Sequence, residues 1–429
     1  MSSVTIDRTG VVVIGGKKVF PIGFSNPPPL GKKAPSGRDA WEELAVGGAS
    51  FVRTGTDGWS LELVDGQIAV ERASQDAAAA HGLHCLLWLG ELTNLPARTA
   101  AQPPSANEQL LRKIVTAFKD HPGLGAYKGI DEPRNPFRGK NWVRPEGLVR
   151  AREKLRTLDA NHPLVITQAP RSPISELVPY RPAFDITGAD IYPVSYPPGV
   201  HSDSPNHDIS VVGDITRKMV EAGGGKPVWM TLQIAWSGAA PSKTNPQVVP
   251  RFPSLQEERF MAYQAIVSGA RGLIFFGGHL TQVCTPADAK AGWNWTFWQQ
   301  TLRPLLAELS SSELQPALVA PNANLRIGTK AHTTGVTDVE LVARRAGTFL
   351  YIIAVKRGGS TSLVDVVGLP PKRDGTALTH GEVLFEYVQQ PPPPPLRPER
   401  QGPRPVTVTA GGFRDWFGPH DAHVYRFAL

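Results

Sequence analysis

The sequence predicts a (β/α)₈ barrel with an N-terminal β-hairpin and a C-terminal β-sandwich. Up to about residue 313 of the 429, short apolar runs alternate with segments of helical period. Eight such alternations indicate a parallel sheet that closes on itself and is covered by helices. Beyond about residue 317 the helical period disappears. Runs of β-branched and aromatic residues separated by turn residues then indicate a sandwich.

These patterns divide the chain into three parts. Residues 1–16 are expected to begin a hairpin, because two β-rich runs flank the pair Gly15-Gly16. The barrel is expected over 17–313 and the sandwich over 314–429.

The barrel strands are expected where the apolar runs lie, with the helices between them. The runs are 19–24, 50–54, 83–89, 124–130, 163–168, 184–192, 227–233 and 272–276. The helical segments are 38–47, 72–81, 105–119, 145–158, 174–180, 210–222, 254–268 and 296–312. Ser105 with Glu108, and Ser254 with Glu257, match the capping box, in which each side chain bonds a backbone N–H at the helix start.

The composition indicates a globular protein and disfavours several other classes of protein. With 41% hydrophobic and 19% charged residues, the chain can bury a large core and is not disordered. The net charge of +7 is scattered, with no basic run interleaved with aromatics, so no nucleic-acid partner is expected. Two cysteines, Cys85 and Cys284, are too few for a disulfide framework and favour a reducing compartment. No membrane-length apolar run or signal-peptide pattern is present, which predicts a cytoplasmic protein with no membrane partner.

Cofactor signatures are missing from the sequence. It contains no phosphate-binding loop, no dinucleotide fingerprint and no zinc-ligand spacing, so we expect neither a cofactor nor a metal. His84 and Cys85 lie inside a predicted strand and are expected to pack in the core. The proline-rich stretch 389–405 is interpreted as a stiff connector rather than a docking peptide.

Polar side chains follow nearly every predicted strand of the barrel. Because the carboxyl ends of these strands meet at one rim, the side chains are expected to converge there. They are Asn26, Arg53, Asp57, Glu91, Asp131, Glu132, Gln168, Asp190, Tyr192, Gln233, Trp236 and His279.

The stretch GAYKGIDEP (125–133) ends the fourth strand on two adjacent carboxylates and a proline. A solvated turn is one interpretation, because Asp and Pro are common turn residues. The position at the end of a barrel strand favours the other interpretation, in which Glu132 points into the cleft as a catalytic carboxylate.

Several segments resemble the TIM-barrel glycoside hydrolases of the clan A type, and more closely a set of bacterial glycosidase-like barrels. They are GKKVFPIGF (16–24), HPGLGAYKGIDEP (121–133), DITGADIYPV (185–194), KPVWMTLQ (226–233), RFPSLQEERFMAYQAIVSGARGLIFF (251–276) and, in the β-domain, FRDWFGPHDAHVYRF (413–427). The resemblance covers nearly the whole chain. It implies a glycoside or oligosaccharide substrate and places Glu132 as the general acid/base, a role that suits the poor glycosidic leaving group.

The sequence departs from this family at strand seven. Clan A enzymes carry a second glutamate there as nucleophile, whereas this chain has Gln233, whose amide cannot take that role. Asp190, Glu91 and Asp57 are the candidates for the second carboxylate. Their spacing from Glu132 would set the outcome, with about 5–5.5 Å for retention and about 6.5–9.5 Å for inversion.

Two other functions remain open. Asp131 and Glu132, with Tyr192, fit a substrate-assisted N-acetylhexosaminidase, in which the substrate's acetamido group is the nucleophile. A carbohydrate-binding or scaffold barrel without catalysis is the third possibility. In each case a sugar is expected to contact rim residues by hydrogen bonds and stacking. The expected contacts are Asn26, Arg53, Asp57, Gln168, Tyr192, Trp229, Gln233, Trp236 and His279. The oligomeric state is left open.

Overall fold

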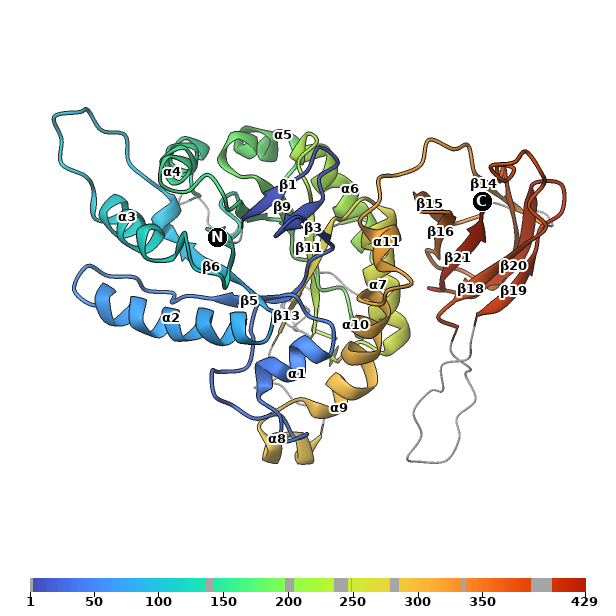
Figure 1. The fold of residues 1–429 in the computed structure, drawn as a ribbon, viewed down its shortest axis with the longest axis horizontal. Helices are drawn as coiled ribbons and strands as arrows, with labels where there is room; N and C mark the ends of the chain where they lie inside the picture. Colours follow the sequence, from blue (N-terminus) through green and yellow to red (C-terminus); the bar gives the residue numbers. More distant parts are fainter. Residues whose placement is uncertain are drawn as a thin grey trace.

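The computed structural model shows a helix-covered barrel joined to a β-sandwich (Figure 1). It describes residues 3–135, 142–196, 204–234, 246–247, 249–277, 285–332, 337–386 and 403–429.

Eight parallel strands form the barrel, in the order β11-β13-β4-β5-β6-β7-β8-β9. Their bounds are β4 (Ile22–Phe24), β5 (Phe51–Thr54), β6 (His84–Gly90), β7 (Leu124–Gly129), β8 (Leu164–Gln168), β9 (Ile186–Ala189), β11 (Trp229–Gln233) and β13 (Gly272–Phe276). Bridges from Thr187 to Val228 and from Asp190 to Thr231 join β9 to β11 and close the circle. Each strand overlaps the apolar run that predicts it, and the predicted fold class is confirmed.

Helices alternate with these strands. They are α1 (Ala40–Val46), α2 (Val64–Ala80), α3 (Ala106–Phe118), α4 (Pro145–Leu158), α5 (Ile174–Leu177) with η3 (Val178–Ala183), α6 (Val211–Gly223), α7 (Leu255–Val267), α8 (Pro286–Ala291), α9 (Trp295–Phe297), η4 (Trp298–Leu302), α10 (Arg303–Leu309) and α11 (Gln315–Leu318). The predicted start of α2 at residue 72 is wrong by eight residues. Gly66 and the exposed Val70 obscure the helical period in its first turns.

Only one of the two predicted capping boxes forms completely. In α7, the Ser254 side chain and the Glu257 side chain each bond the other's backbone N–H. In α3, Ser105 accepts from the backbone of Glu108, but the Glu108 carboxylate binds Arg98 and Lys154 instead. Tertiary ion pairing therefore replaces half of that box.

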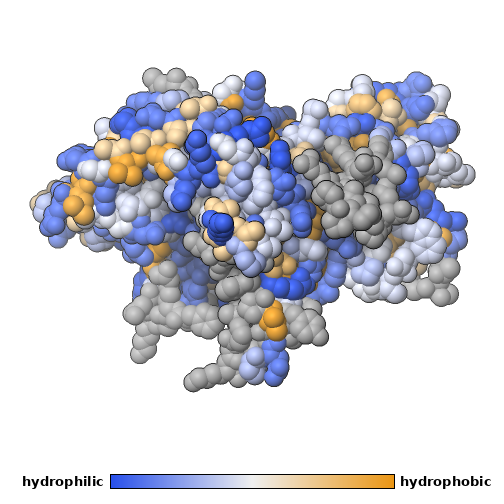
Figure 2. All heavy atoms as spheres, turned by 90° about the horizontal axis from the view of Figure 1, so that it is seen from below, coloured by the Kyte–Doolittle hydropathy of each residue, from blue (hydrophilic) through white to orange (hydrophobic). Residues whose placement is uncertain are grey.

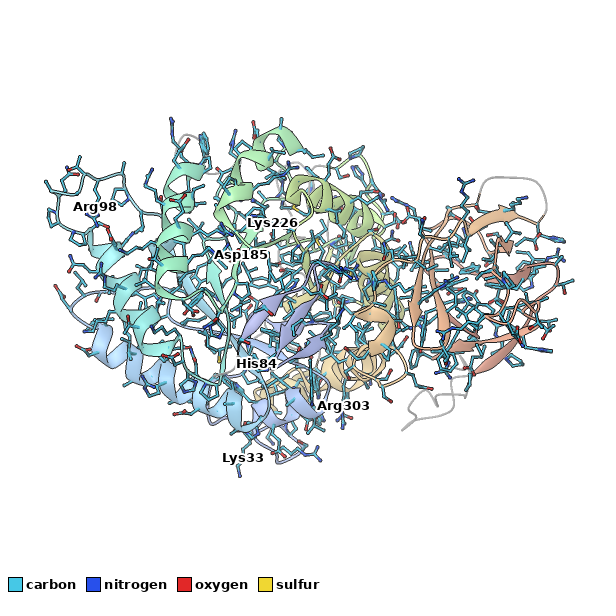
Figure 3. All side chains as sticks on the ribbon, turned by 45° about the horizontal axis from the view of Figure 1, so that its top comes forward. Lys33, His84, Arg98, Asp185, Lys226 and Arg303 are labelled. Atoms are coloured by element: carbon cyan, nitrogen blue, oxygen red, sulfur yellow. The ribbon has the colours of Figure 1, made fainter. Side chains whose placement is uncertain are left out.

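A three-stranded N-terminal sheet, β1 (Val4–Ile6), β2 (Val12–Ile14) and β3 (Lys17–Val19), closes the amino-terminal end of the barrel. Its β2-β3 turn is the predicted Gly15-Gly16 pair, and both glycines have positive φ, at 55° and 80°. Val4 and Val12 pack with the barrel interior. His84, at the start of β6, also lies in the body of the barrel (Figure 3).

The C-terminal domain is a sandwich of two antiparallel sheets. One contains β14 (Gly328–Ala331), β17 (Ser362–Val367) and β20 (Gly412–Phe417); the other contains β15 (Val339–Ala346), β16 (Phe349–Lys356), β21 (Ala422–Ala428), β18 (His380–Leu384) and β19 (Arg404–Thr407). The five-stranded sheet packs against α7, and its Tyr351, Ile353 and Val424 belong to the same core as the barrel helices. A short ribbon, β10 (Ser195–Tyr196) with β12 (Val249–Pro250), lies beside the barrel mouth.

Candidate active site

A cavity of about 200 Å³ lies at the carboxyl ends of the barrel strands. Apolar side chains from the middle of the strands form its floor, and polar side chains from the strand ends form its wall. The lining residues are Ser25, Leu86, Lys128, Asp131, Glu132, Val165, Thr167, Asp190, Tyr192, Trp229, Thr231, Ile274 and Phe276. Of the predicted site residues, this cavity brings together Asp131, Glu132, Asp190, Tyr192 and Trp229.

Strand β7 supplies a buried cation that the sequence analysis missed. Side chains alternate along a strand, so Lys128 faces inward like Ala126, while Tyr127 between them packs among the helices. Lys128 is buried and forms an ion pair with Asp131. Its ammonium nitrogen also lies 5.5 Å from the ring centroid of Trp88. The alternation along the strand could have predicted this, because Lys128 is two residues from Ala126 and therefore on the same, inward face.

Glu132 occupies a strained backbone conformation directly after β7. Its φ of 46° lies in the left-handed region, which costs a non-glycine residue on the order of 1–3 kcal/mol. Two hydrogen bonds hold it there. Its backbone N–H donates to the Thr167 carbonyl at 2.8 Å, and its Oε2 accepts from Asn135 Nδ2 at 2.6 Å. Such strain is concentrated at functional sites.

Asp190, directly after β9, is the most perturbed acid of the cavity. Burial, and then the negative charges of Glu132 and Asp131, raise its pKa to about 8. Its Oδ1 is buried, and among the described residues it has no hydrogen-bond partner. The Tyr192 hydroxyl bonds to Asp190, and the Tyr192 ring stacks on Phe276 with centroids 5.4 Å apart. This environment favours the protonated form of the Asp190 carboxyl.

Four predicted residues lie outside the cavity, on the neighbouring rim. Arg53 pairs with the exposed Asp57 at 2.7 Å, and its guanidinium lies 4.3 Å above the Trp88 ring. Asn26 is exposed and lines a separate, larger groove. Glu91 begins η1 (Glu91–Thr93), is exposed, and lines a third hollow near α4.

The two predicted glutamines are buried in different settings. Gln168 does not line the cavity, whereas the preceding residue, Thr167, does. The buried side-chain amide of Gln168 has no hydrogen-bond partner within the described chain. Gln233 exchanges two 2.8 Å hydrogen bonds with the backbone N–H and carbonyl of Val194. Its amide thus holds the loop after β9. Trp236 and His279 lie outside the described residues.

Among the described residues, no three His, Cys, Asp or Glu side chains are placed together to hold a metal ion. No helix in this part of the chain has both the length and the apolar character that crossing a membrane requires.

Comparison with known proteins places the fold. No protein-family model and no curated protein matches the sequence. Among solved structures, one described as a glycoside hydrolase aligns at 12% identity and a TM-score of 0.61, covering 100% of this chain and 97% of the other. A glycoside hydrolase family 5 protein from Bacteroides vulgatus aligns at 13% identity and 0.60, covering 99% and 93%. The family 51 α-L-arabinofuranosidase AbfB from Bifidobacterium longum aligns at 11% and 0.52, covering 100% and 97%.

These alignments cover the barrel and the sandwich together. The chain therefore has a TIM-barrel fold followed by a C-terminal β-domain, as these solved structures do.

Proposed function

We propose that this protein is a glycoside hydrolase that cleaves an O-glycosidic bond in the 200 Å³ cavity, with Glu132 and Asp190 as its two working carboxyl groups. One observation carries the proposal. Asp190, with a raised pKa and a buried oxygen that lacks a partner among the described residues, lines the same cavity as Glu132. Perturbed acids in a cleft at the rim of such a barrel are typical of catalytic sites.

Glycoside hydrolysis requires one carboxyl that holds a proton and one that is ionised. With a pKa of about 8, Asp190 holds its proton at neutral pH and is suited to protonate the leaving oxygen. Glu132 accepts a hydrogen bond from Asn135, which orients its carboxyl group for the role of nucleophile or base. The family resemblance implies the acid/base role for Glu132, and the electrostatics of the cavity favour Asp190 as the first proton donor.

Other residues of the cavity set the charge around Asp190 and the surface that a sugar would contact. Lys128 pairs with Asp131, so Asp131 has a partner of its own and acts on Asp190 through its charge. Tyr192 and Trp229 also line the cavity and bring aromatic rings to it, which can contact the face of a sugar ring.

The division of roles is tested with two leaving groups on the same sugar. A dinitrophenyl group departs without protonation, whereas an alkyl alcohol needs an acid. Asp190→Asn should therefore lose on the order of 10²–10⁴-fold in the rate on alkyl glycosides and much less on dinitrophenyl glycosides. Glu132→Gln should lose activity on both. Near-wild-type rates for Glu132→Gln would refute the assignment.

A carbohydrate-binding barrel without catalysis is the second candidate, and Gln233 favours it. The amide stands where clan A enzymes carry their nucleophile, and both of its polar atoms are used by Val194. Sugar binding without hydrolysis of any dinitrophenyl glycoside in a broad panel would support this alternative. The substrate-assisted mechanism is less well supported, because Asp131 is paired with Lys128 and Tyr192 bonds to Asp190.

A further inference from the structure

A second hollow, of about 740 Å³, lies beside the cavity, between the loop after β4 and helix α2. We call it the α2 groove; its walls include Pro28, Leu30, Trp41, Trp59, Leu63 and Val70. Ser25 lines both the groove and the cavity, so the two spaces adjoin at the barrel rim. Along α2 the lining runs from Leu63 to Ser74, a length of about 16 Å at 1.5 Å per residue.

The surface of the α2 groove is mostly apolar, although Asn26, Arg53, Thr56, Gln67 and Glu71 also line it. The indole N–H of Trp41 donates to the Pro28 carbonyl at 2.7 Å, and that of Trp59 donates to the Trp88 carbonyl at 2.9 Å. With these N–H groups satisfied, the two rings offer the groove mainly apolar surface.

Exposed aliphatic side chains gather at the same place. Leu30, Leu63 and Val70 are 45%, 63% and 69% exposed, and Leu61 beside them is 46% exposed. Figure 2, viewed from below, shows hydrophobic surface gathered at the left-hand end, the side on which Figure 1 places α2. Large exposed apolar patches of this kind mark binding sites.

Several polar groups in the groove are already engaged. Glu71 accepts from the Thr54 hydroxyl at 2.7 Å and from the Gly55 N–H at 2.8 Å. Gln67 accepts from the Ser60 N–H and donates to the Gly58 carbonyl. An oligosaccharide needs many hydrogen-bond partners, whereas a hydrocarbon chain needs none.

We infer that the substrate is a glycoside of a long alkyl or acyl aglycone, with its sugar in the cavity and its hydrocarbon chain along the α2 groove. This inference rests on the proposed function. It is supported by the shared Ser25, by the apolar walls and by the length of the groove along α2.

The probes are n-hexyl, n-octyl and n-decyl β-D-glucopyranoside, used below their micelle-forming concentrations. Binding to Glu132→Gln protein is measured by titration calorimetry, so that turnover does not interfere. Each methylene buried in the groove should tighten binding about fourfold, which corresponds to about 0.8 kcal/mol. Val70→Asp should abolish this chain-length dependence. Val220→Asp is the matched control, because Val220 is also an exposed helical valine (39%) but lies on α6.

The outcomes separate this inference from the proposed function. Affinity that does not change with chain length, or a dependence that survives Val70→Asp, would overturn the inference. Hydrolysis of dinitrophenyl glycosides by the wild-type protein would leave the proposed function standing in that case. Chain-length dependence lost in Val70→Asp and kept in Val220→Asp would support the inference.

Discussion

The cavity and the barrel–sandwich interface both hold carboxylates at least partly out of solvent, but they shift the pKa of these groups in opposite directions. At the interface, burial alone would raise the pKa of Asp214, yet hydrogen bonds from Arg357 and Asn206 bring it below its ordinary value. Glu308, on α10, binds Arg259 at 2.8 Å and accepts a hydrogen bond from the Tyr263 hydroxyl. In the cavity, burial and neighbouring acids raise the pKa of Asp190 instead.

The difference lies in the supply of cations. Arg357 of the sandwich pairs with Asp214 of α6. Arg259 of α7 pairs with Glu308 of α10 and also donates to the Ala422 carbonyl of β21, so each of these two acids has an arginine. In the cavity, the one described cation among the lining residues, Lys128, is paired with Asp131. Under the proposed function, this acid of raised pKa, with no cation partner of its own among the described residues, serves as the proton donor.

The largest effect is expected when that proton donor is removed. Asp190→Asn should lower the rate on alkyl glycosides by on the order of 10²–10⁴-fold, because the amide cannot protonate the leaving oxygen. Steady-state kinetics on purified protein provide the measurement. A rate within threefold of wild type would show that Asp190 is a structural acid, like those at the interface.

The next effect should appear at the interface, and in stability rather than activity. Glu308→Gln leaves the charge of Arg259 unmatched, which should cost about 3 kcal/mol in urea-induced unfolding. Activity per folded molecule should not change. Glu313→Gln is the control, because Glu313 is exposed and lies 3.9 Å from Arg426, and such long surface pairs contribute less than about 1 kcal/mol. Equal losses of unfolding free energy in the two variants would show that the buried pair of Glu308 stabilises the protein no more than a surface pair does.

Asp190 should also make stability depend on pH. Its folded pKa, about 8, is above the ordinary 3.8, so the folded state binds the proton more tightly than the unfolded state does. This contribution is fully present below pH about 4 and is lost as pH rises through about 8, at up to about 1.4 kcal/mol per pH unit. Asp190→Asn should flatten the unfolding free energy between those limits. Parallel curves for the two proteins would contradict the raised pKa.

The smallest effect is expected from Lys128. Its positive charge lowers the pKa of Asp190 against the other influences, so Lys128→Met should raise that pKa further. The alkaline limb of the pH–rate profile should then move to higher pH. A merely structural role for Lys128 would lower the rate without moving the limb.

Local patterns predicted the fold and the two central acids. Each barrel strand is a short apolar run, and Glu132 and Asp190 lie close to the carboxyl ends of two of them, so their convergence could be predicted from strand order. Strand alternation alone would have found Lys128, because it is in phase with Ala126.

Other positions were decided by geometry that the sequence does not display. Strand β6 has an irregular register between Trp88 and Gly90, and Gly90 has a φ of 50°. The chain therefore turns into η1 and carries Glu91 away from the cavity. The Glu108 carboxylate forms an ion pair with Arg98, ten residues earlier, instead of completing the predicted capping box. No local sequence pattern predicts this ion pair.

The most direct test of the proposed site is the structure of the Glu132→Gln protein soaked with a glycoside of the sugar that the wild-type protein hydrolyses. We expect a sugar ring in the 200 Å³ cavity, with Asp190 within hydrogen-bond distance of the glycosidic oxygen and residue 132 beside the anomeric carbon. An empty cavity with Asp190 paired to a cation of the chain would contradict it.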